Sequence, residues 1–307
     1  MQPAGRPLII SMLAVGIVSI STASIFIKLC HDAPPVVIAA ARLGIASIVL
    51  IPGSMIFKDK SPLSIPLHHL KFIFLSALFL SLHFFFWITS LKHTSVLSSV
   101  VIVTSNPIFI GIASYLFFKE RIHSFLLIGI LLGLAGGILI ALSDMHAGAG
   151  NSAYGDLMAL GGAVMASCYF LVGRKVRKEL DLLSYIVPVY ALTSLLLLGL
   201  VIILGHGFSG YSQSTYFYFV LLALIPQLLG HSSLNWSLKY VTATTVAVFV
   251  LGEPVCSSVL AYFFLGEKAT FLQVAGGLLI LTGIFLAAKE RTDTPDKVEG
   301  LSSGRTL

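Results

Sequence analysis

Seven side chains with charged or hydrogen-bonding groups lie inside long apolar runs of this sequence, where such groups are rare. Within membrane-spanning segments such residues are costly, face the interior of a helix bundle and mark substrate or proton pathways. The chemistry that they predict is recognition of a charged or polar small molecule, or transfer of a proton. These candidate substrate-binding residues are Arg42, His83, Trp87, Asn106, Gln227, His231 and Glu253.

Glu253 supports the most specific of these predictions. It lies at the middle of the apolar run 241–265, about 18 Å from either end of a helix that covers the run. Pro254 follows it, and a proline removes a backbone donor and tends to kink a helix. We expect Glu253 to bind a cationic group or to carry a proton. The alternative is a packed carboxyl group that bonds to a neighbouring helix.

Arg42 lies inside the run 34–57, about 12 Å from its outer end. Its guanidinium is too deep to reach water easily, so it needs an acidic partner, carbonyl groups or a substrate carboxylate. The planar fork of donors on arginine suits a bidentate carboxylate. Structural pairing and substrate contact are equal alternatives at this position. Two roles are likewise open for Trp87: its ring either stacks on a substrate or fills space between helices.

Polar residues form stripes on four of the apolar runs. A lone histidine or serine in such a helix is more often a helix–helix contact than a ligand group. Because the four stripes form two pairs related by an internal repeat, we expect these helices to line a pathway. The stripes consist of Ser76, His83, Trp87 and Ser90; Ser95, Ser99 and Asn106; Gln227, His231 and Asn235; and Thr242, Thr245, Phe249 and Glu253.

The composition identifies the class of protein. Of 307 residues, 57% are apolar and only 10% are charged, and the mean hydropathy is +0.97. A soluble domain carries about a quarter charged residues, so a cytosolic enzyme, a nucleic-acid binder and a disordered chain are excluded. Cys30, Cys168 and Cys256 form neither a disulfide framework nor a paired metal site. The sequence is that of an integral membrane protein, whose surroundings are a lipid bilayer.

Ten apolar runs are long enough to cross a membrane as helices, which need about 20 mostly apolar residues. They are too continuously apolar for barrel strands, which alternate over about ten residues. We therefore expect an all-α membrane protein. The first run is not followed by a small-residue cleavage site, so it is a retained span rather than a signal peptide. The runs cover residues 8–29, 34–57, 70–91, 94–118, 122–143, 154–174, 182–205, 214–238, 241–265 and 269–289.

Lysine and arginine predict the orientation, because they accumulate in cytoplasmic segments. With a cytoplasmic N-terminus, 15 of the 19 lie on the inside, and one, Arg42, lies within a span. Only Lys28, Lys92 and Lys268 lie at outer ends. Both termini are therefore expected in the cytoplasm, with a polar tail at 290–307. The net charge of +6 reflects this topology and requires no anionic partner.

The two halves of the chain are related by an offset of 147 residues. Each half holds five runs, and because five is odd, the second half must be inverted in the membrane. Inverted repeats are typical of secondary transporters, whose substrate site lies near the midplane between the repeats. The alternative is a duplicated bundle with no transport role. The offset aligns Lys28 with Lys175, Leu91-Lys92 with Leu238-Lys239, Pro107 with Pro254, Tyr115 with Tyr262, and Glu120 with Glu267.

Two motifs at this offset resemble the end of an EamA-type repeat. They are Asn106-Pro107, Tyr115, Glu120 and Gly129 to Gly137, and Glu253-Pro254, Tyr262, Gly266-Glu267, Gly276-Gly277 and Gly283. Two such repeats resemble the ten-helix members of the drug/metabolite transporter superfamily over about residues 8–289. The resemblance implies repeats at 8–143 and 154–289 and transport, often export, of small metabolites such as amino acids or related compounds.

Small residues predict close helix packing. Gly129, Gly133 and Gly137 form a ridge that permits close helix approach. Packing within the monomer is expected, and a homodimer formed through the ridge is the alternative. We interpret Glu120 and Glu267, at the ends of two runs, as interfacial structural residues.

Two other classes of function agree less well with the sequence. Gly207-Phe208-Ser209-Gly210 resembles the motif around the serine of rhomboid proteases. Ser209 and His231 would lie about 25 Å apart, however, too far to activate a serine nucleophile. A lipid or polyprenyl carrier would need an apolar lateral opening, which no sequence pattern reveals. No HExxH, Walker or phosphate-loop motif occurs, so no metal, cofactor or ATP-driven pumping is expected.

Overall fold

The computed structural model describes residues 5–56, 65–118, 124–146 and 152–289, and the regular elements within these ranges are all helical. The predicted all-α class is confirmed. Glu120 and the tail at 290–307 lie outside the described residues. The helices are α1 (Arg6–Ser21), α2 (Ala23–Leu29), α3 (Pro35–Ile56), α4 (Leu67–Leu91), α5 (Val96–Val103), α6 (Asn106–Phe118), α7 (Ser124–His146), α8 (Ser152–Arg177), α9 (Leu182–Ile203), α10 (Gln213–Leu222), η1 (Ala223–His231), α11 (Ser232–Ser237), α12 (Ala243–Val250), α13 (Glu253–Leu265) and α14 (Phe271–Lys289).

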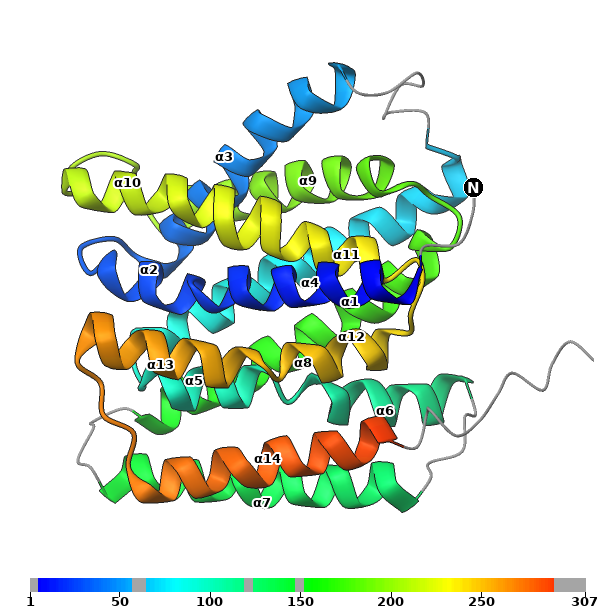
Figure 1. Cartoon of the computed structure of the whole chain (residues 1–307). Coiled ribbons are helices and arrows are strands. Elements are labelled where there is room, and N and C mark those ends of the chain that lie inside the picture. The colour runs from blue at the N-terminus through cyan, green and yellow to red at the C-terminus, as the bar shows by residue number, and fades with distance from the viewer. Residues whose placement is uncertain (1–4, 57–64, 119–123, 147–151, 290–307) are drawn as a thin grey trace, which may run out of the picture.

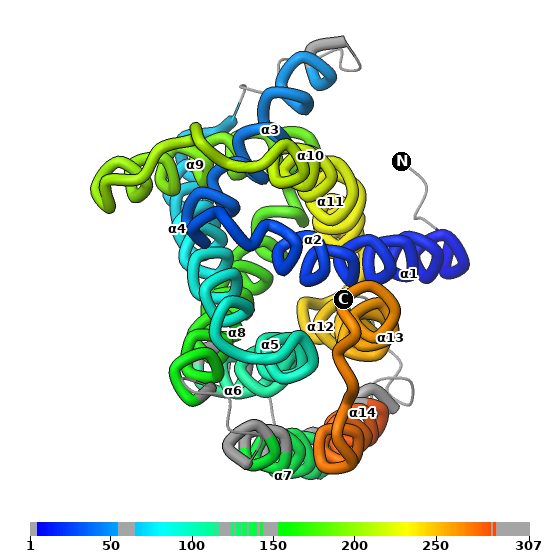
Figure 2. The backbone as a smooth tube through the Cα atoms, turned by 90° about the vertical axis from the view of Figure 1, so that its left-hand side faces the viewer, coloured from blue at the N-terminus to red at the C-terminus, as the bar shows by residue number. Residues whose placement is uncertain are grey.

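These helices coincide with the ten apolar runs, and most of them lie side by side along one direction (Figure 1). Within the described residues, eight helical segments are long and apolar enough to cross a membrane. Two shorter apolar helices, Leu127–Leu139 and Phe271–Gly283, belong to α7 and α14. Seen along the bundle, α4 packs against α8, and α7 and α14 pack together at one edge (Figure 2).

Two of the runs break where a proline was predicted to kink the helix. α5 ends at Val103 and α6 begins at Asn106, before Pro107. In the second half, α12 ends at Val250 and α13 begins at Glu253, before Pro254. Proline lacks a backbone N–H and disfavours the α conformation at the residue before it, so the chain restarts as a new helix. The two breaks lie at the same position in each repeat.

The helices that precede these breaks also begin in the same way. Ser95 caps α5, and its side-chain oxygen accepts a hydrogen bond from Ser98 N at 3.1 Å. Thr242 caps α12 and accepts from Thr245 N at 3.2 Å. A capping oxygen satisfies one of the free N–H groups at a helix start. Both caps are related by the 147-residue offset, so each of these half-helices starts and stops at matching positions.

The eighth run contains a π-helix, η1, between α10 and α11. It spans Ala223–His231 and contains Pro226. π-Helical turns have i→i+5 hydrogen bonds and occur frequently at functional sites. The wider turn changes the angular spacing of the residues within it, which include Gln227 and His231.

Glycines bring α7 and α14 into close contact. A Cβ atom at Gly283 would lie 2.7 Å from the carbonyl oxygen of Gly129, and one at Gly136 would clash with the carbonyl oxygen of Gly276. Gly129 therefore meets Gly283, and Gly136 meets Gly276, which means that the two helices cross antiparallel. Gly129 and Gly276 are equivalent positions in the two repeats, and so are Gly136 and Gly283. The two contacts are therefore related by the repeat.

The predicted ridge is used inside the chain at Gly129 and Gly133. A Cβ atom at Gly133 would lie 3.0 Å from Ile108 Cδ1, whereas one at Gly137 would meet nothing within 4 Å. Packing within the monomer is thus observed at two of the three positions. A homodimer formed through the ridge stays an untested alternative.

One end of the bundle is joined by polar contacts between distant segments. Lys28 Nζ lies 3.7 Å from Glu267 Oε1 and donates to Thr94 O at 2.9 Å. Glu267 Oε2 also accepts from Val96 N, the first residue of α5, at 2.9 Å. Glu267 thereby joins α2, α5 and the turn before α14, which agrees with the structural role expected for it.

At this same end, Asp32 closes the turn between α2 and α3 onto the start of α10. Its carboxylate accepts from Ser212 N at 2.7 Å and from Thr215 Oγ1 at 2.5 Å. These hydrogen bonds favour the charged form and lower the pKa of Asp32 to about 2.

The opposite end is joined by arginine. Arg174 Nη1 donates to Leu238 O at 2.5 Å and to Lys239 O at 3.0 Å. Arg177 is buried and donates from Nε to Asn235 O at 2.9 Å and from Nη1 to Leu180 O. The end of α8 is in this way tied to the end of α11 and to the turn before α9.

Candidate functional site

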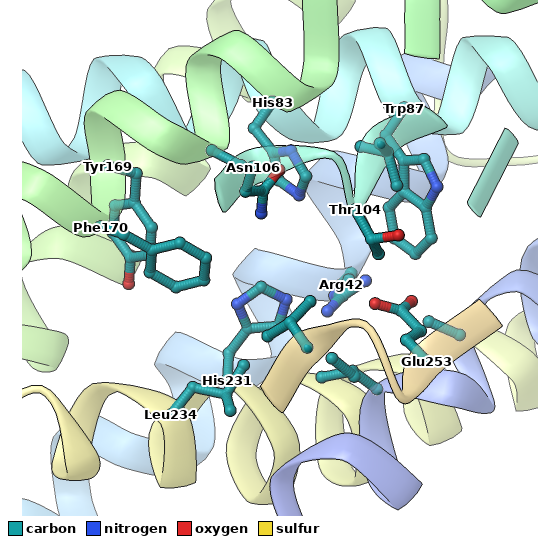
Figure 3. A pocket seen from close by; sticks show the side chains of 15 residues that line it. Arg42, His83, Trp87, Thr104, Asn106, Tyr169, Phe170, His231, Leu234 and Glu253 are labelled. Atoms are coloured by element: carbon teal, nitrogen blue, oxygen red, sulfur yellow. The ribbon is translucent and has the colours of Figure 1, made fainter. Parts of the chain in front are cut away.

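Six of the seven predicted residues line one pocket in the middle of the bundle (Figure 3). The pocket holds about 470 Å³ of space between protein atoms, including space open to solvent. Helices α7 and α14 contribute none of its lining residues. The six are Arg42, His83, Trp87, Asn106, His231 and Glu253.

Arg42 is the most deeply buried of these, with no exposed surface. Its Nε donates to Gln227 Oε1 at 2.8 Å, and its guanidinium carbon lies 4.2 Å from the centre of the Phe84 ring. The two terminal nitrogens, Nη1 and Nη2, are buried and have no hydrogen-bond partner. Gln227, the seventh predicted residue, therefore does not line the pocket but orients Arg42 from behind.

A second buried arginine, Arg177, has hydrogen-bond partners within the protein and serves as a comparison for Arg42. Arg177 is 1% exposed, and its donors reach the carbonyl oxygens of Asn235 and Leu180. Arg42 differs because the end of its fork faces the pocket. Buried polar groups are almost always hydrogen-bonded, so the free end of Arg42 indicates a site for a ligand with acceptor oxygens.

Other unpartnered polar atoms gather around Arg42. Within the described residues, seven buried side-chain nitrogen or oxygen atoms have no hydrogen-bond partner, and six of them belong to this cluster. Four of the six are donors; the acceptor is Asn106 Oδ1, and His231 Nδ1 can take either role. The donors are Arg42 Nη1, Arg42 Nη2, Trp87 Nε1 and Gln227 Nε2.

The aromatic residues give these polar groups a rigid frame. His83 Nδ1 donates to Gly162 O at 2.9 Å, which holds its ring parallel to Trp87, with 5.9 Å between the ring centres. Phe84 lies between Arg42 and His231, with its ring centre 5.2 Å from that of His231. Trp87 therefore stacks within the protein and presents its indole edge to the pocket.

Asn106 and Glu253 enter the pocket from the two repeat-related helix breaks. Each is the first residue of the half-helix that follows its break. Glu253 is 5% exposed, and Figure 3 shows its carboxylate in the same part of the pocket as the guanidinium of Arg42. The proline breaks thus bring the side-chain amide and the carboxylate to the depth of Arg42.

The pocket is lined symmetrically by the two halves of the chain. Several lining residues form pairs separated by the repeat offset, so equivalent positions of both halves face the same space. A site with this property lies at the interface between repeats. The pairs are Ala23 with Phe170, Trp87 with Leu234, Val103 with Val250, and Asn106 with Glu253.

A family model describes both halves. The model of the EamA-like transporter family matches residues 7–142 and again residues 153–289. The chain belongs to the EamA-like transporter family. It is a multi-pass membrane transporter, and its family is not one of enzymes.

Known EamA relatives are distant in sequence but match most of the chain. An uncharacterized transporter of Bacillus subtilis, YdfC, is 26% identical over 80% of this chain and 79% of its own length. A probable amino-acid metabolite efflux pump of Escherichia coli is 25% identical over 83% of this chain and 86% of its own. Solute carrier family 35 member G1 of the mouse is 25% identical over 85% of this chain and 73% of its own length.

A solved crystal structure has the same fold as this EamA chain. It superposes with a TM-score of 0.70 at 21% identity, over 94% of this chain and the whole of that chain. At this level of identity the match establishes the arrangement of the helices.

Nine of the fifteen residues that line this EamA pocket were not among the predicted ones. Most of the nine are apolar, and in apolar runs such residues give no signal that separates a pocket from a core. The nine include Thr104, Tyr169 and Phe170. Asn235, expected on the same stripe as His231, is not one of the lining residues. Its Oδ1 accepts from Tyr169 Oη at 3.0 Å, and its Nδ2 donates to His231 O at 2.8 Å.

Proposed function

We propose that this EamA transporter is a secondary transporter that exports small metabolites with a carboxylate group, such as amino acids or related compounds. The substrate binds in the pocket between the repeats, and the two halves rock to expose it alternately on each side of the membrane. The observation that carries the proposal is the set of unpartnered donors around the free end of Arg42. The name of the E. coli relative, a probable amino-acid metabolite efflux pump, supports both the substrate class and the direction.

The roles within the pocket follow from charge and hydrogen-bonding capacity. Arg42 Nη1 and Nη2 bind the two oxygens of a carboxylate, a geometry for which the guanidinium fork is well suited. Trp87, which also lines the pocket, supplies a further donor from Nε1. Glu253 and Asn106 Oδ1 are acceptors, so they bind an ammonium group of the substrate, or Glu253 carries the coupled proton.

The remaining predicted residues, His83 and His231, hold the aromatic wall of the site. His83 is fixed by Gly162 and stacks on Trp87, and His231 packs against Phe84. We propose that His231 Nδ1, which is buried without a partner, contacts the polar end of the substrate directly.

The proposed topology is ten spans in two inverted five-helix repeats, at residues 8–143 and 154–289, with both termini in the cytoplasm. The antiparallel crossing of α7 and α14 supports the inversion, because these helices are equivalent in the two repeats. The lysine and arginine distribution supports the orientation. The bacterial relatives support the cell membrane as the location.

The test is counterflow of a mixed metabolite panel into proteoliposomes, with and without a pH gradient, for the wild-type protein and Glu253→Gln. We expect one class of carboxylate-bearing compound to move, faster with the gradient, and Glu253→Gln to abolish the effect of the gradient. Glu267→Gln is the matched control, because Glu267 lies at the end of the bundle and joins helices there. It should leave gradient dependence unchanged.

Three outcomes would revise the proposal in different ways. Transport that depends on neither Glu253 nor the gradient would indicate a passive facilitator in which Glu253 is a packing residue. Transport of compounds without a carboxylate would remove the role assigned to Arg42. If lipid or polyprenyl compounds move and no metabolite does, the protein is a lipid or polyprenyl carrier instead of a metabolite transporter.

A further inference from the structure

Three side chains with metal-ligating atoms meet at the end of the bundle where α4 begins. His68 and His69 are neighbours in the first turn of α4, and Glu179 lies in the turn between α8 and α9. Figure 1 shows both segments at the end of the bundle that holds the N-terminus. One ligating atom from each of the three residues can be chosen so that all lie within 4.8 Å of one another.

Two distances within this cluster are close to those between the ligands of a single metal ion. His69 Nε2 lies 3.1 Å from Glu179 Oε2, and His68 Nε2 lies 3.7 Å from the same oxygen. In a tetrahedral zinc site with bonds of about 2.0–2.2 Å, ligand atoms are separated by about 3.3–3.6 Å. The two observed separations lie on either side of that range.

Neighbouring residues on a helix normally point about 100° apart, because a turn holds about 3.6 residues. Here the rings of His68 and His69 instead lie together, with centres 4.0 Å apart, and both direct Nε2 toward Glu179. His69 is buried, with 5% of its side chain exposed, so water does not compete for its imidazole on that side.

The geometry points to a zinc site formed by His68, His69 and Glu179. Two imidazoles and one carboxylate suit zinc, whereas magnesium and calcium prefer ligand sets made of oxygen alone. The side chains of His68 and Glu179 are 66% and 62% exposed, which leaves room for water in a fourth position. This site is separate from the central pocket and does not depend on the proposed transport function.

Zinc at this position connects the two halves of the chain. His68 and His69 belong to the first half and Glu179 to the second, and α4 packs against both α8 and α9. A bound ion adds a direct link between the start of α4 and the turn that joins α8 to α9. Because it binds the folded chain, zinc raises the stability of that chain.

The test uses the full chain, purified without a polyhistidine tag and stripped of metal. Zinc affinity is measured by competition with a fluorescent chelator for the wild type, His68→Ala, His69→Ala and Glu179→Gln. We expect one zinc per chain and affinity at least about tenfold weaker in each variant, as for other losses around a zinc site. His206→Ala is the matched control, because His206 is exposed in the loop after α9 and away from the cluster.

Thermal unfolding gives an independent readout. Zinc should raise the melting temperature of the wild type and of His206→Ala but not that of Glu179→Gln, and magnesium should raise none of them. His68 and Glu179 are exposed, so their variants remain informative if His69→Ala fails to fold. The proposal is wrong if the wild type binds no zinc in the micromolar range, or if His68→Ala and Glu179→Gln bind it as tightly as His206→Ala.

Discussion

Arg42 and Gln227 are 185 residues apart in the sequence, yet Arg42 Nε donates to Gln227 Oε1 at 2.8 Å in the core of the bundle. The contact joins α3 of the first half to the π-helix of the second. It uses the inner donor of Arg42 and leaves the two terminal nitrogens pointing at the pocket. Gln227 is therefore a positioning residue for the guanidinium.

The first prediction concerns the role of Arg42 in binding a carboxylate. Arg42→Ala should weaken the binding of a carboxylate substrate by about 10- to 150-fold, the range for losing hydrogen bonds to a charged group, about 1.5–3 kcal/mol. Binding of the corresponding amide should change much less. Both affinities are measured by titration of the folded, monodisperse protein.

Arg177→Ala is the control for that prediction. Arg177 is also a buried arginine, but its donors are used by backbone carbonyls. Its loss should lower the melting temperature without changing the ratio of carboxylate to amide affinity. If both variants reduce this ratio equally, Arg42 has a structural role only.

The second prediction separates the indole N–H of Trp87 from its ring. Trp87→Phe keeps an aromatic ring beside His83 but removes the unpartnered Nε1 donor. A neutral hydrogen bond contributes about 0.5–1.5 kcal/mol, so we expect substrate affinity to fall by about two- to tenfold with little change in stability. An unchanged affinity together with a lower melting temperature would make Trp87 a space-filling residue.

The third prediction tests the close crossing of α7 and α14. Gly136→Val places a side chain against the backbone of Gly276 and against Ile280, whose Cγ1 would lie 2.6 Å from the new Cβ. Overpacking of this kind costs about 1–3 kcal/mol, which should appear as a lower melting temperature in detergent. Gly137→Val, one residue along, meets nothing within 4 Å and should unfold like the wild type. Equal stability of the two variants would rule out a tight crossing.

The fourth prediction is a pH dependence at Asp32. Its pKa in the folded protein is about 2, because Thr215 and Ser212 donate to the carboxylate, whereas an unperturbed aspartate has a pKa near about 3.9. A lowered pKa contributes stability that is present above the unfolded value and is lost as the pH falls through the folded value. The melting temperature of the wild type should exceed that of Asp32→Asn at pH 7, and the difference should shrink between about pH 4 and pH 2.

Thr215→Val is the companion variant, because it removes only the hydroxyl donor from Asp32. It should show the same dependence on pH with a smaller amplitude. A difference between the wild type and Asp32→Asn that stays constant down to pH 2 would contradict the account.

The helical class, the approximate spans and the equivalence of the two halves follow from local chemistry, so they can be predicted from the amino-acid sequence. Apolar runs of about 20 residues must become helices in a bilayer, since no water satisfies the backbone there. Pro107 and Pro254 each follow a break between two half-helices, and the kink expected at such a residue is a local property of proline. Pro52 and Pro188 lie inside helices, so a proline alone does not predict a break. The repeat offset then identified Asn106 and Glu253 as equivalent positions before any contact was known.

Which side-chain donors have hydrogen-bond partners and which do not depends on the packing of the helices. Arg42 and Arg177 are both arginines in or beside apolar runs, but packing gives Arg177 backbone carbonyls and leaves the fork of Arg42 open. Gln227, in the π-helix, bonds to Arg42 Nε, and Asn235, in α11, bonds to Tyr169. These hydrogen bonds join segments that are far apart in the chain. Hydrophobic periodicity predicts where each helix lies in the sequence but not which helices come into contact.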